Sequence, residues 1–254
     1  MLSFFDIGGT VQASQRTVHG GPTLIRLLAR LTDVDVPESG QSLSDRLSQW
    51  LGWTDAIALS TALNGDLPAG VAGARADGSA EESECARLRA SLAKTIAGDS
   101  TFAARRRREE STADGAVDYA VFRQRYLSLQ QTMETGIGSL RGRLRAKLAG
   151  RTPGMTRLAM VDAVMEQALG AREHTLLATV PGLLGKHFER LRQAGQAALA
   201  DAEVAGTTGS ADGAPATPGA WLDVFRKDMQ SVLLAELDVR IQPVEGLLAA
   251  LRTR

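Results

Sequence analysis

One unbroken apolar stripe runs along the middle of the chain, with steps of three or four residues and a mean step of about 3.6. Only an α-helix places such positions on one face, so the stripe predicts a long amphipathic helix over about 115–149. An extended left-handed coiled coil would hold the mean near 3.5, and the larger value favours a helix packed in a globular bundle. The stripe consists of Tyr119, Phe122, Tyr126, Leu129, Met133, Ile137, Leu140, Leu144 and Leu148.

Residues 20–64 predict an N-terminal helical segment. A first helix carries several leucines after Thr23, and a second opens at a capping box formed by Ser42 and Asp45 and runs to about Asn64. A short helix is predicted over roughly 81–97, with Leu88, Leu92 and Ile96 on one face.

Start and stop signals divide the second half of the chain. Gly150 is a typical residue just after a helix end, and Thr152 followed by Pro153 is a typical helix start. The next helix is predicted to bury Leu158, Val161, Met165, Ala168 and Leu176, to kink or break at Pro181, and to continue to about Val204. A second Thr-Pro pair at 217–218 precedes the last helix, within 220–254.

The stretches between these helices lack periodicity and are rich in Gly, Ala and Pro. Residues 65–80 are predicted to be a flexible loop, 205–219 a disordered loop and 1–19 a disordered tail. We therefore expect an all-α protein, an elongated multi-helix bundle with two flexible loops. Residues 81–204 would form the central bundle, with the long helix, its successor and the last helix packed antiparallel. Residues 20–64 would pack on one end or form a small domain.

The amino-acid composition indicates which partners and which cellular compartment to expect. The formal net charge is zero, so no global field draws the whole chain to nucleic acid or an anionic membrane. A single cysteine excludes an internal disulfide framework and fits a reducing compartment. No stretch approaches the roughly 20 apolar residues that a membrane span needs, and we expect a cytoplasmic protein.

No catalytic constellation is visible, and we expect neither an enzyme nor a cofactor or metal. Residues 6–10 (DIGGT) resemble the phosphate-binding turn of sugar kinases, but the strands that should flank such a turn are absent from the pattern. His19, His174 and His187 lack the spacing of metal ligands, and His187 fits a partly buried, hydrogen-bonded imidazole better. The acids around Cys85 argue against a reactive thiolate.

The notable charge asymmetry is basic. Residues 101–151 hold eleven basic and five acidic residues, a net charge of +6. Such a patch is able to contact a phosphate backbone, although no aromatic residue is interleaved to stack on bases. The alternative is a helix face that pairs with acids such as Glu81, Glu82 and Glu84, with cations favoured near a helix C-terminus. The candidate contact residues are Arg105, Arg106, Arg107, Arg108, Arg141, Arg143, Arg145, Lys147 and Arg151.

Four aromatic residues are candidate anchors of the core or of a partner. Trp50 and Trp53 lie three residues apart on nearly one face of the predicted helix, and Phe122 and Tyr126 belong to the apolar stripe. Large aromatic side chains are far more common as core or interface anchors than as ligand-stacking platforms.

Three blocks of the sequence, GPTLIRLLARLTDVDVPE, QSLSDRLSQWLGWTDAIALSTALN and QPVEGLLAALR, resemble an uncharacterised proteobacterial family. Its members are encoded beside a MotA- or ExbB-like membrane protein and an OmpA- or MotB-like peptidoglycan-binding protein. That gene set is similar to the Zorya type of anti-phage defence.

The resemblance implies a cytoplasmic accessory protein of a proton-driven membrane motor, with no catalytic site of its own. Its partner would be the cytoplasmic part of the motor, and self-association into a homo-oligomer is also open. The alternative function is a nucleic-acid-binding effector that grips DNA with the basic end of the long helix, Arg141 to Arg151.

Overall fold

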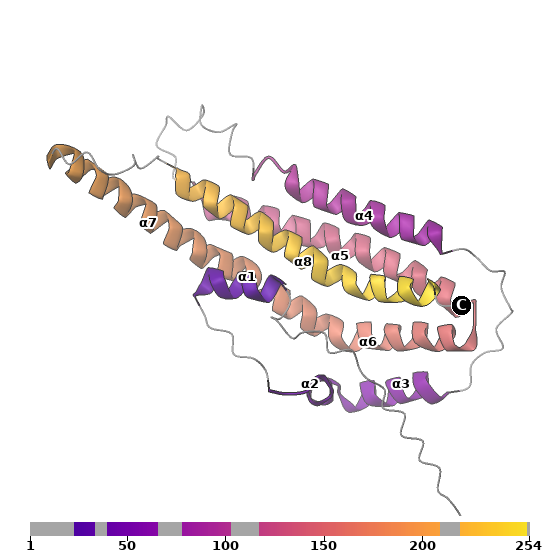
Figure 1. Cartoon of the computed structure of the whole chain (residues 1–254). Coiled ribbons are helices and arrows are strands. Elements are labelled where there is room, and N and C mark those ends of the chain that lie inside the picture. Colours follow the sequence, from indigo (N-terminus) through magenta and orange to yellow (C-terminus); the bar gives the residue numbers. More distant parts are fainter. Residues whose placement is uncertain (1–22, 34–39, 66–77, 103–116, 209–218, 253–254) are drawn as a thin grey trace, which may run out of the picture.

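The computed structural model describes residues 23–33, 40–65, 78–102, 117–208 and 219–252. All regular secondary structure within these ranges is helical, which confirms the all-α prediction (Figure 1). The helices are α1 (Thr23–Thr32), α2 (Leu43–Trp50), α3 (Trp53–Asn64), α4 (Ser79–Ala97), α5 (Tyr119–Ala149), α6 (Pro153–Leu177), α7 (Val180–Thr208) and α8 (Ala220–Arg252). No helix in these ranges combines the length and the apolar character that crossing a membrane requires.

Helices α5 and α8 form the centre of the bundle (Figure 1). The apolar stripe of α5 is confirmed as a core face, because eight of its nine residues are buried and Tyr119 is partly buried against them. The apolar positions of α8 close the core from the other side, and Val232, Leu233 and Val244 are fully buried there. The burial of two continuous apolar faces against each other is the main source of stability.

The directions of α5, α6 and α8 alternate along the chain, which agrees with the predicted antiparallel packing of the long helix, its successor and the last helix (Figure 1). The centroids of the Phe122 and Phe225 rings, near the starts of α5 and α8, lie 5.2 Å apart. Further along both helices Tyr126 contacts Glu236, so α5 and α8 run parallel. Helices α6 and α7 follow one another along the bundle and run opposite to both α5 and α8 (Figure 1). The predicted break does occur, because α6 ends at Leu177 and Pro181 lies in the first turn of α7.

Helix α6 buries a different set of residues from the predicted one. Leu158 and Leu176 are 37% and 57% exposed, whereas Ala159 and Leu177 are buried. The cause is that α6 packs between α5 on one side and α3 on the other. Because two opposite sides of α6 are each partly buried, its apolar residues do not fall on one stripe, and the apolar periodicity of the helix is weak.

The N-terminal segment also differs in detail. The predicted helix to Asn64 is divided in two at Leu51 and Gly52, because the Asp55 carboxylate accepts a hydrogen bond from the Gly52 N–H at 3.0 Å and restarts the helix. The capping box at Ser42 is confirmed. Helix α1 packs on α7 and α8, and α3 packs on α6.

The predicted loops are only partly described. Helix α7 extends to Thr208 and so enters the predicted loop 205–219, while residues 209–218 lie outside the described residues. The predicted tail 1–19, and residues 66–77 of the predicted loop 65–80, also lie outside the described residues.

Candidate functional site

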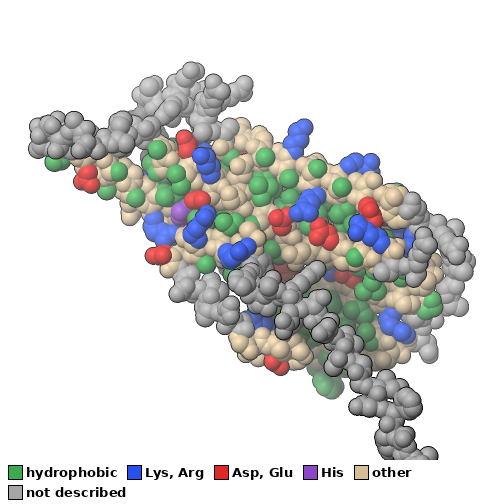
Figure 2. All heavy atoms as spheres, in the orientation of Figure 1, with side chains coloured by type: hydrophobic (Ala, Val, Ile, Leu, Met, Phe, Trp, Pro, Cys, Tyr) green, Lys and Arg blue, Asp and Glu red, His purple; other side chains and the backbone are tan. Residues whose placement is uncertain are grey.

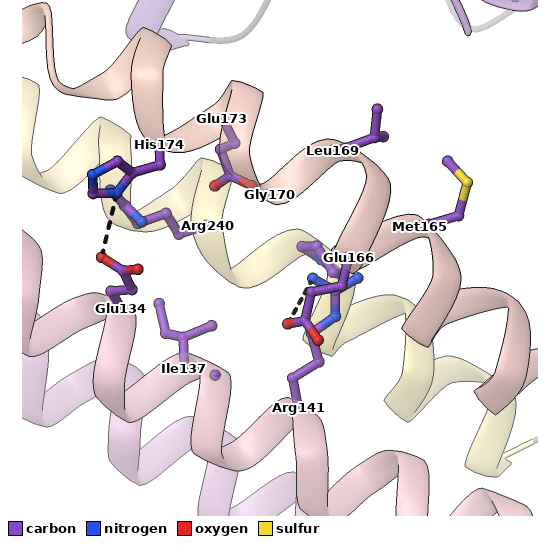
Figure 3. A pocket seen from close by; sticks show the side chains of 12 residues that line it. Glu134, Ile137, Arg141, Met165, Glu166, Leu169, Gly170, Glu173, His174 and Arg240 are labelled. Carbon is purple, nitrogen blue, oxygen red and sulfur yellow. Dashed lines mark ion pairs between the residues drawn. The ribbon is translucent and has the colours of Figure 1, made fainter. Parts of the chain in front are cut away.

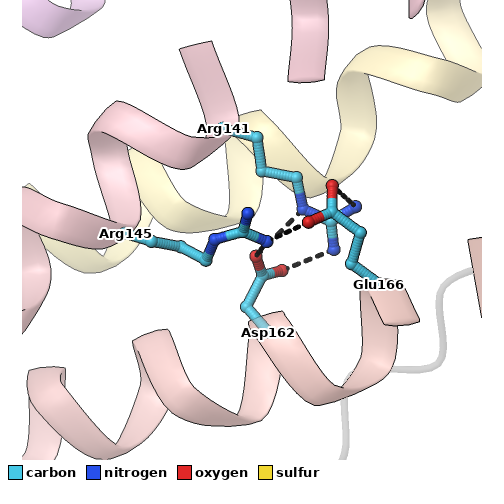
Figure 4. Close-up of polar contacts among 4 residues, drawn as sticks. All are labelled: Arg141, Arg145, Asp162 and Glu166. Carbon is cyan, nitrogen blue, oxygen red and sulfur yellow. Dashed lines mark hydrogen bonds and ion pairs between the residues drawn. The ribbon is translucent and has the colours of Figure 1, made fainter. Parts of the chain in front are cut away.

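The basic residues on the inner side of α5 form ion pairs with α6 (Figure 4). Arg141 binds Asp162 through two hydrogen bonds, of 2.9 and 2.7 Å, and its Nη1 lies 3.4 Å from Glu166. Arg145 contacts the same two carboxylates. Burial by itself lowers the pKa of Arg141, but the hydrogen bonds and charges of Asp162 and Glu166 outweigh it and raise the pKa. This two-by-two network joins α5 to α6.

The basic residues on the outer side of α5 pair with α4. Arg143 contacts Glu84, and Lys147 contacts the buried Glu81. Arg151 donates a hydrogen bond to the Leu251 carbonyl at 3.1 Å. The structure therefore brings these cations to intramolecular acceptors, as the helix-face interpretation expects. Arg105 to Arg108 lie outside the described residues.

The four aromatic candidates separate into two groups. Phe122 and Tyr126 are fully buried and belong to the core. Trp50 is half-buried, and the Arg172 guanidinium lies over its ring at 4.7 Å. Trp53 is 81% exposed. The prediction that Trp50 and Trp53 share one helix face is wrong, because the break at Gly52 places them on different helices.

Helix α3 carries apolar residues on both of its sides. Leu59 and Ala62 lie on the less exposed side, which packs on α6, whereas Trp53, Ile57 and Leu63 are 46% exposed or more. The one charged residue of α3, Asp55, is occupied in capping Gly52. A solvent-facing helix normally carries charged side chains on its outer side, so α3 is an exception.

A buried polar cluster between α5 and α8 is absent from the sequence predictions. Glu236 is fully buried and accepts hydrogen bonds from Tyr126 Oη at 2.6 Å, Gln130 Nε2 at 3.0 Å and Arg240 Nε at 2.8 Å. Burial and the charge of Glu236 raise the pKa of Tyr126 well above its usual value. The signal in the sequence is that Glu236 follows Val232 and Leu233 at helical spacing, on the apolar side of α8.

A pocket of about 300 Å³ opens beside this cluster, between α5, α6 and α8 (Figure 3). Arg240 and Pro243 of α8 contribute to its lining, together with residues of α5 and α6. The lining combines apolar side chains with charges of both signs, a composition typical of sites for small molecules. Nothing in the sequence analysis points to this pocket, because its residues come from three helices.

His187 and Cys85 are both buried in the bundle. The Nε2 of His187 lies 2.8 Å from Asp228 Oδ2, which confirms the interpretation of a hydrogen-bonded imidazole. Cys85 is buried, and burial together with Glu245 raises the pKa of its thiol, which makes it less reactive. In the ranges described, no group of three or more His, Cys, Asp and Glu residues forms a metal site. His19 and residues 6–10 lie outside those ranges.

Comparison with known proteins gives a family. No curated protein and no solved structure matches the chain. A family model described as "Protein of unknown function (DUF3348)" matches residues 10–253, nearly the whole chain. The match spans every helix described above, from α1 to α8. The chain therefore belongs to this family, the proteins of unknown function DUF3348.

Proposed function

We propose that this protein is a helical interaction protein, without a catalytic site of its own, that docks a partner protein through the outer side of α3. We define this docking face by Trp53 and Ile57, which lie one helical turn apart on the side of α3 away from Leu59 and Ala62. The cellular role in the proposal, a cytoplasmic accessory protein of a proton-motor-linked, Zorya-like anti-phage system, rests on the resemblance of the sequence blocks described above.

The observation that carries the proposal is an apolar helix side that the fold leaves uncovered. Trp53 exposes 81% of its surface, and Ile57, one helical turn later, exposes 50%. Keeping such side chains in water forgoes about 25 cal/mol for each Å² of apolar surface that a partner would cover. Tryptophan is also enriched among the residues that dominate binding energy at protein interfaces.

The chemistry of the docking face favours an amphipathic helix as the occupant. Neither Trp53 nor Ile57 carries a charge, and the one charged residue of α3, Asp55, lies on the other side and is bound by the Gly52 N–H. An acidic or basic peptide would gain no ion pair there, whereas the apolar side of a helix would bury its own surface against Trp53 and Ile57. A helix from the cytoplasmic part of the motor is the occupant that we propose.

The test compares two variants of the docking face with a matched control. Trp53→Ala and Ile57→Ser remove exposed apolar groups from α3, and Val121→Ser removes one from α5, where Val121 is 49% exposed. All three are surface changes, and we expect their unfolding free energies to stay within about 0.5 kcal/mol of the wild type. In a pull-down with the motor subunits, we expect the α3 variants to lose retention at least about tenfold and the control to keep it.

Other outcomes are informative. Wild-type protein that is not retained by the motor subunits, or α3 variants that are retained equally well, would overturn the proposal. Sedimentation velocity tests a second copy of the chain as the occupant. A dimer that the Trp53→Ala variant abolishes would assign the docking face to self-association instead of the motor.

Nucleic-acid binding by Arg141, Arg143, Arg145, Lys147 and Arg151 stays the alternative proposal. We expect it to be weaker than docking, because the first four of these residues pair with acids of α4 and α6. To contact phosphates, these cations would have to break their ion pairs with the acids, and this cost would reduce the free energy of DNA binding. A gel shift with DNA at low salt tests it, and binding that falls steeply with salt and is lost in Arg143→Glu would favour it.

A further inference from the structure

The pocket between α5, α6 and α8 has two chemically different ends (Figure 3). At one end, Arg141 and Glu166 pair with each other and with Asp162 and Arg145. At the other end, Glu134, Glu173 and His174 surround Arg240. Only this second end keeps charged groups that the described fold does not saturate, and we call it the open end.

Arg240 is the deep cation of the open end. Its side chain is 10% exposed, and its Nε is fixed by the Glu236 carboxylate at 2.8 Å. Within the described residues, no hydrogen bond to its Nη1 or Nη2 is found, and neither atom is among the buried nitrogens that lack a partner. The terminal edge of the guanidinium therefore faces the pocket, in a fixed orientation that suits a carboxylate.

The outer part of the open end is acidic. Glu134 and Glu173 come from α5 and α6, and both are exposed. His174 Nδ1 lies 3.9 Å from Glu134, beyond hydrogen-bond distance. Glu173 has no ion pair within 4.0 Å among the described residues and interacts with Arg141 only at longer range. Two carboxylates at the mouth suit an ammonium group.

The floor and walls complete the site. Pro243, which lies inside α8, contributes an apolar ring to the lining beside Arg240. Ile137, Met165 and Leu169 provide an apolar wall. Gly170 in α6 lines the pocket, and a Cβ at this position would meet no atom within 4 Å. The glycine is therefore not required by helix packing, although it costs about 1 kcal/mol relative to alanine.

We infer that this pocket binds a small organic zwitterion that carries a carboxylate and an ammonium group a few bonds apart. The carboxylate binds the Arg240 guanidinium, the hydrocarbon part packs against Ile137 and Leu169, and the ammonium lies between Glu134 and Glu173. A volume of about 300 Å³ is at the small end of ligand pockets and accommodates a molecule of amino-acid size.

Calorimetric titration with matched compounds tests the inference. The zwitterions are γ-aminobutyrate and 5-aminopentanoate, and the singly charged controls are butyrate and butylamine, each at up to about 10 mM. We expect at least one zwitterion to bind at least about tenfold more tightly than either control, because it alone satisfies both ends of the site.

Three variants locate the binding. Glu134→Gln with Glu173→Gln removes exposed acids, and we expect the zwitterion to lose about tenfold in affinity. Butyrate should bind equally well or more tightly, because its carboxylate is no longer repelled by these acids. Gly170→Leu places a bulky side chain at the pocket lining, at a position where a Cβ meets no atom within 4 Å. Gly142→Leu, at a position of α5 whose Cβ would also have free space, is the matched control. We expect Gly170→Leu alone to abolish binding, with both leucine variants folded by circular dichroism.

Three results would contradict the inference about the ligand. No heat with either zwitterion at these concentrations would overturn the inference. Binding that survives Gly170→Leu would place the ligand elsewhere, and butyrate binding as tightly as the zwitterions would remove the ammonium from the ligand class.

Discussion

Glu236 shows how a single residue departs from its local pattern. It lies on the apolar side of α8 and has 0% exposure, yet three donors from Tyr126, Gln130 and Arg240 satisfy its oxygens. A buried carboxylate without such partners would be very costly, so the cluster exists only as a unit. The pairing of Glu236 with Arg240 also fixes the arginine that faces the pocket.

Breaking this unit on one side should be much worse than removing both charges. We expect Glu236→Ala to lower the free energy of unfolding by about 3–5 kcal/mol, because Arg240 keeps a nearly buried charge without its partner. The double variant Glu236→Met with Arg240→Met should recover most of that loss, because buried pairs are often replaceable by apolar residues. Urea unfolding measures both, and a double variant no more stable than the single one would contradict the argument.

At the scale of helices, close approach is decided at particular glycines. A Cβ on Gly195 of α7 would lie 2.6 Å from Cδ1 of Trp221, at the start of α8, so this glycine lets the tryptophan pack across the helix. A Cβ on Gly142 of α5 would meet no atom within 4 Å. The same residue type therefore has a packing role in α7 and carries only a propensity cost in α5.

Alanine substitutions at these two glycines should change stability in opposite directions. We expect Gly142→Ala to raise the free energy of unfolding by up to about 1 kcal/mol through helix propensity. Gly195→Ala should lower it by about 1–3 kcal/mol, because Trp221 must shift. Thermal and urea unfolding of the two variants provide the measurement, and changes of the same sign would show that the two positions do not differ in packing.

For the whole molecule, α4 is attached differently from the central helices. Its apolar contacts are supplemented by partly exposed ion pairs, with Arg143 of α5 and with Asp238, Glu245 and Arg252 of α8. Figure 2 shows that acidic and basic side chains lie next to one another on the face it draws. Exposed pairs are weak individually and are screened by salt. The α5–α8 contact is mostly apolar, and its polar cluster around Glu236 is buried, so salt screens it much less.

Salt should therefore loosen α4 before the rest of the bundle. We expect amide hydrogen exchange within α4 to accelerate about threefold to tenfold between about 0.05 and 0.5 M NaCl, with little change in the buried turns of α5 and α8. Arg89→Gln, which removes the pairs with Asp238 and Glu245, should reproduce part of the effect at low salt. Uniform exchange across α4, α5 and α8 at both salt concentrations would refute this expectation.

The sequence predicts most helices but little of the candidate sites. The stripe of α5 and the starts at Ser42 and Thr152 are correct because periodicity and capping act over a few residues. The restart at Gly52 was missed because glycine has no capping side chain, and only Asp55, three residues later, signals it. The pocket was missed because its lining combines three helices.

The all-helical character and the apolar side of α5 follow from the amino-acid pattern alone, since both depend on neighbours three or four residues away. The tertiary structure decided the parallel pairing of α5 with α8, the acid partners of the basic residues and the burial of Glu236. Tyr126 and Glu236 are 110 residues apart in the sequence, and Arg141 and Asp162 are 21 apart. Contacts at such separations depend on how the whole chain packs, because no local pattern specifies which apolar side meets which.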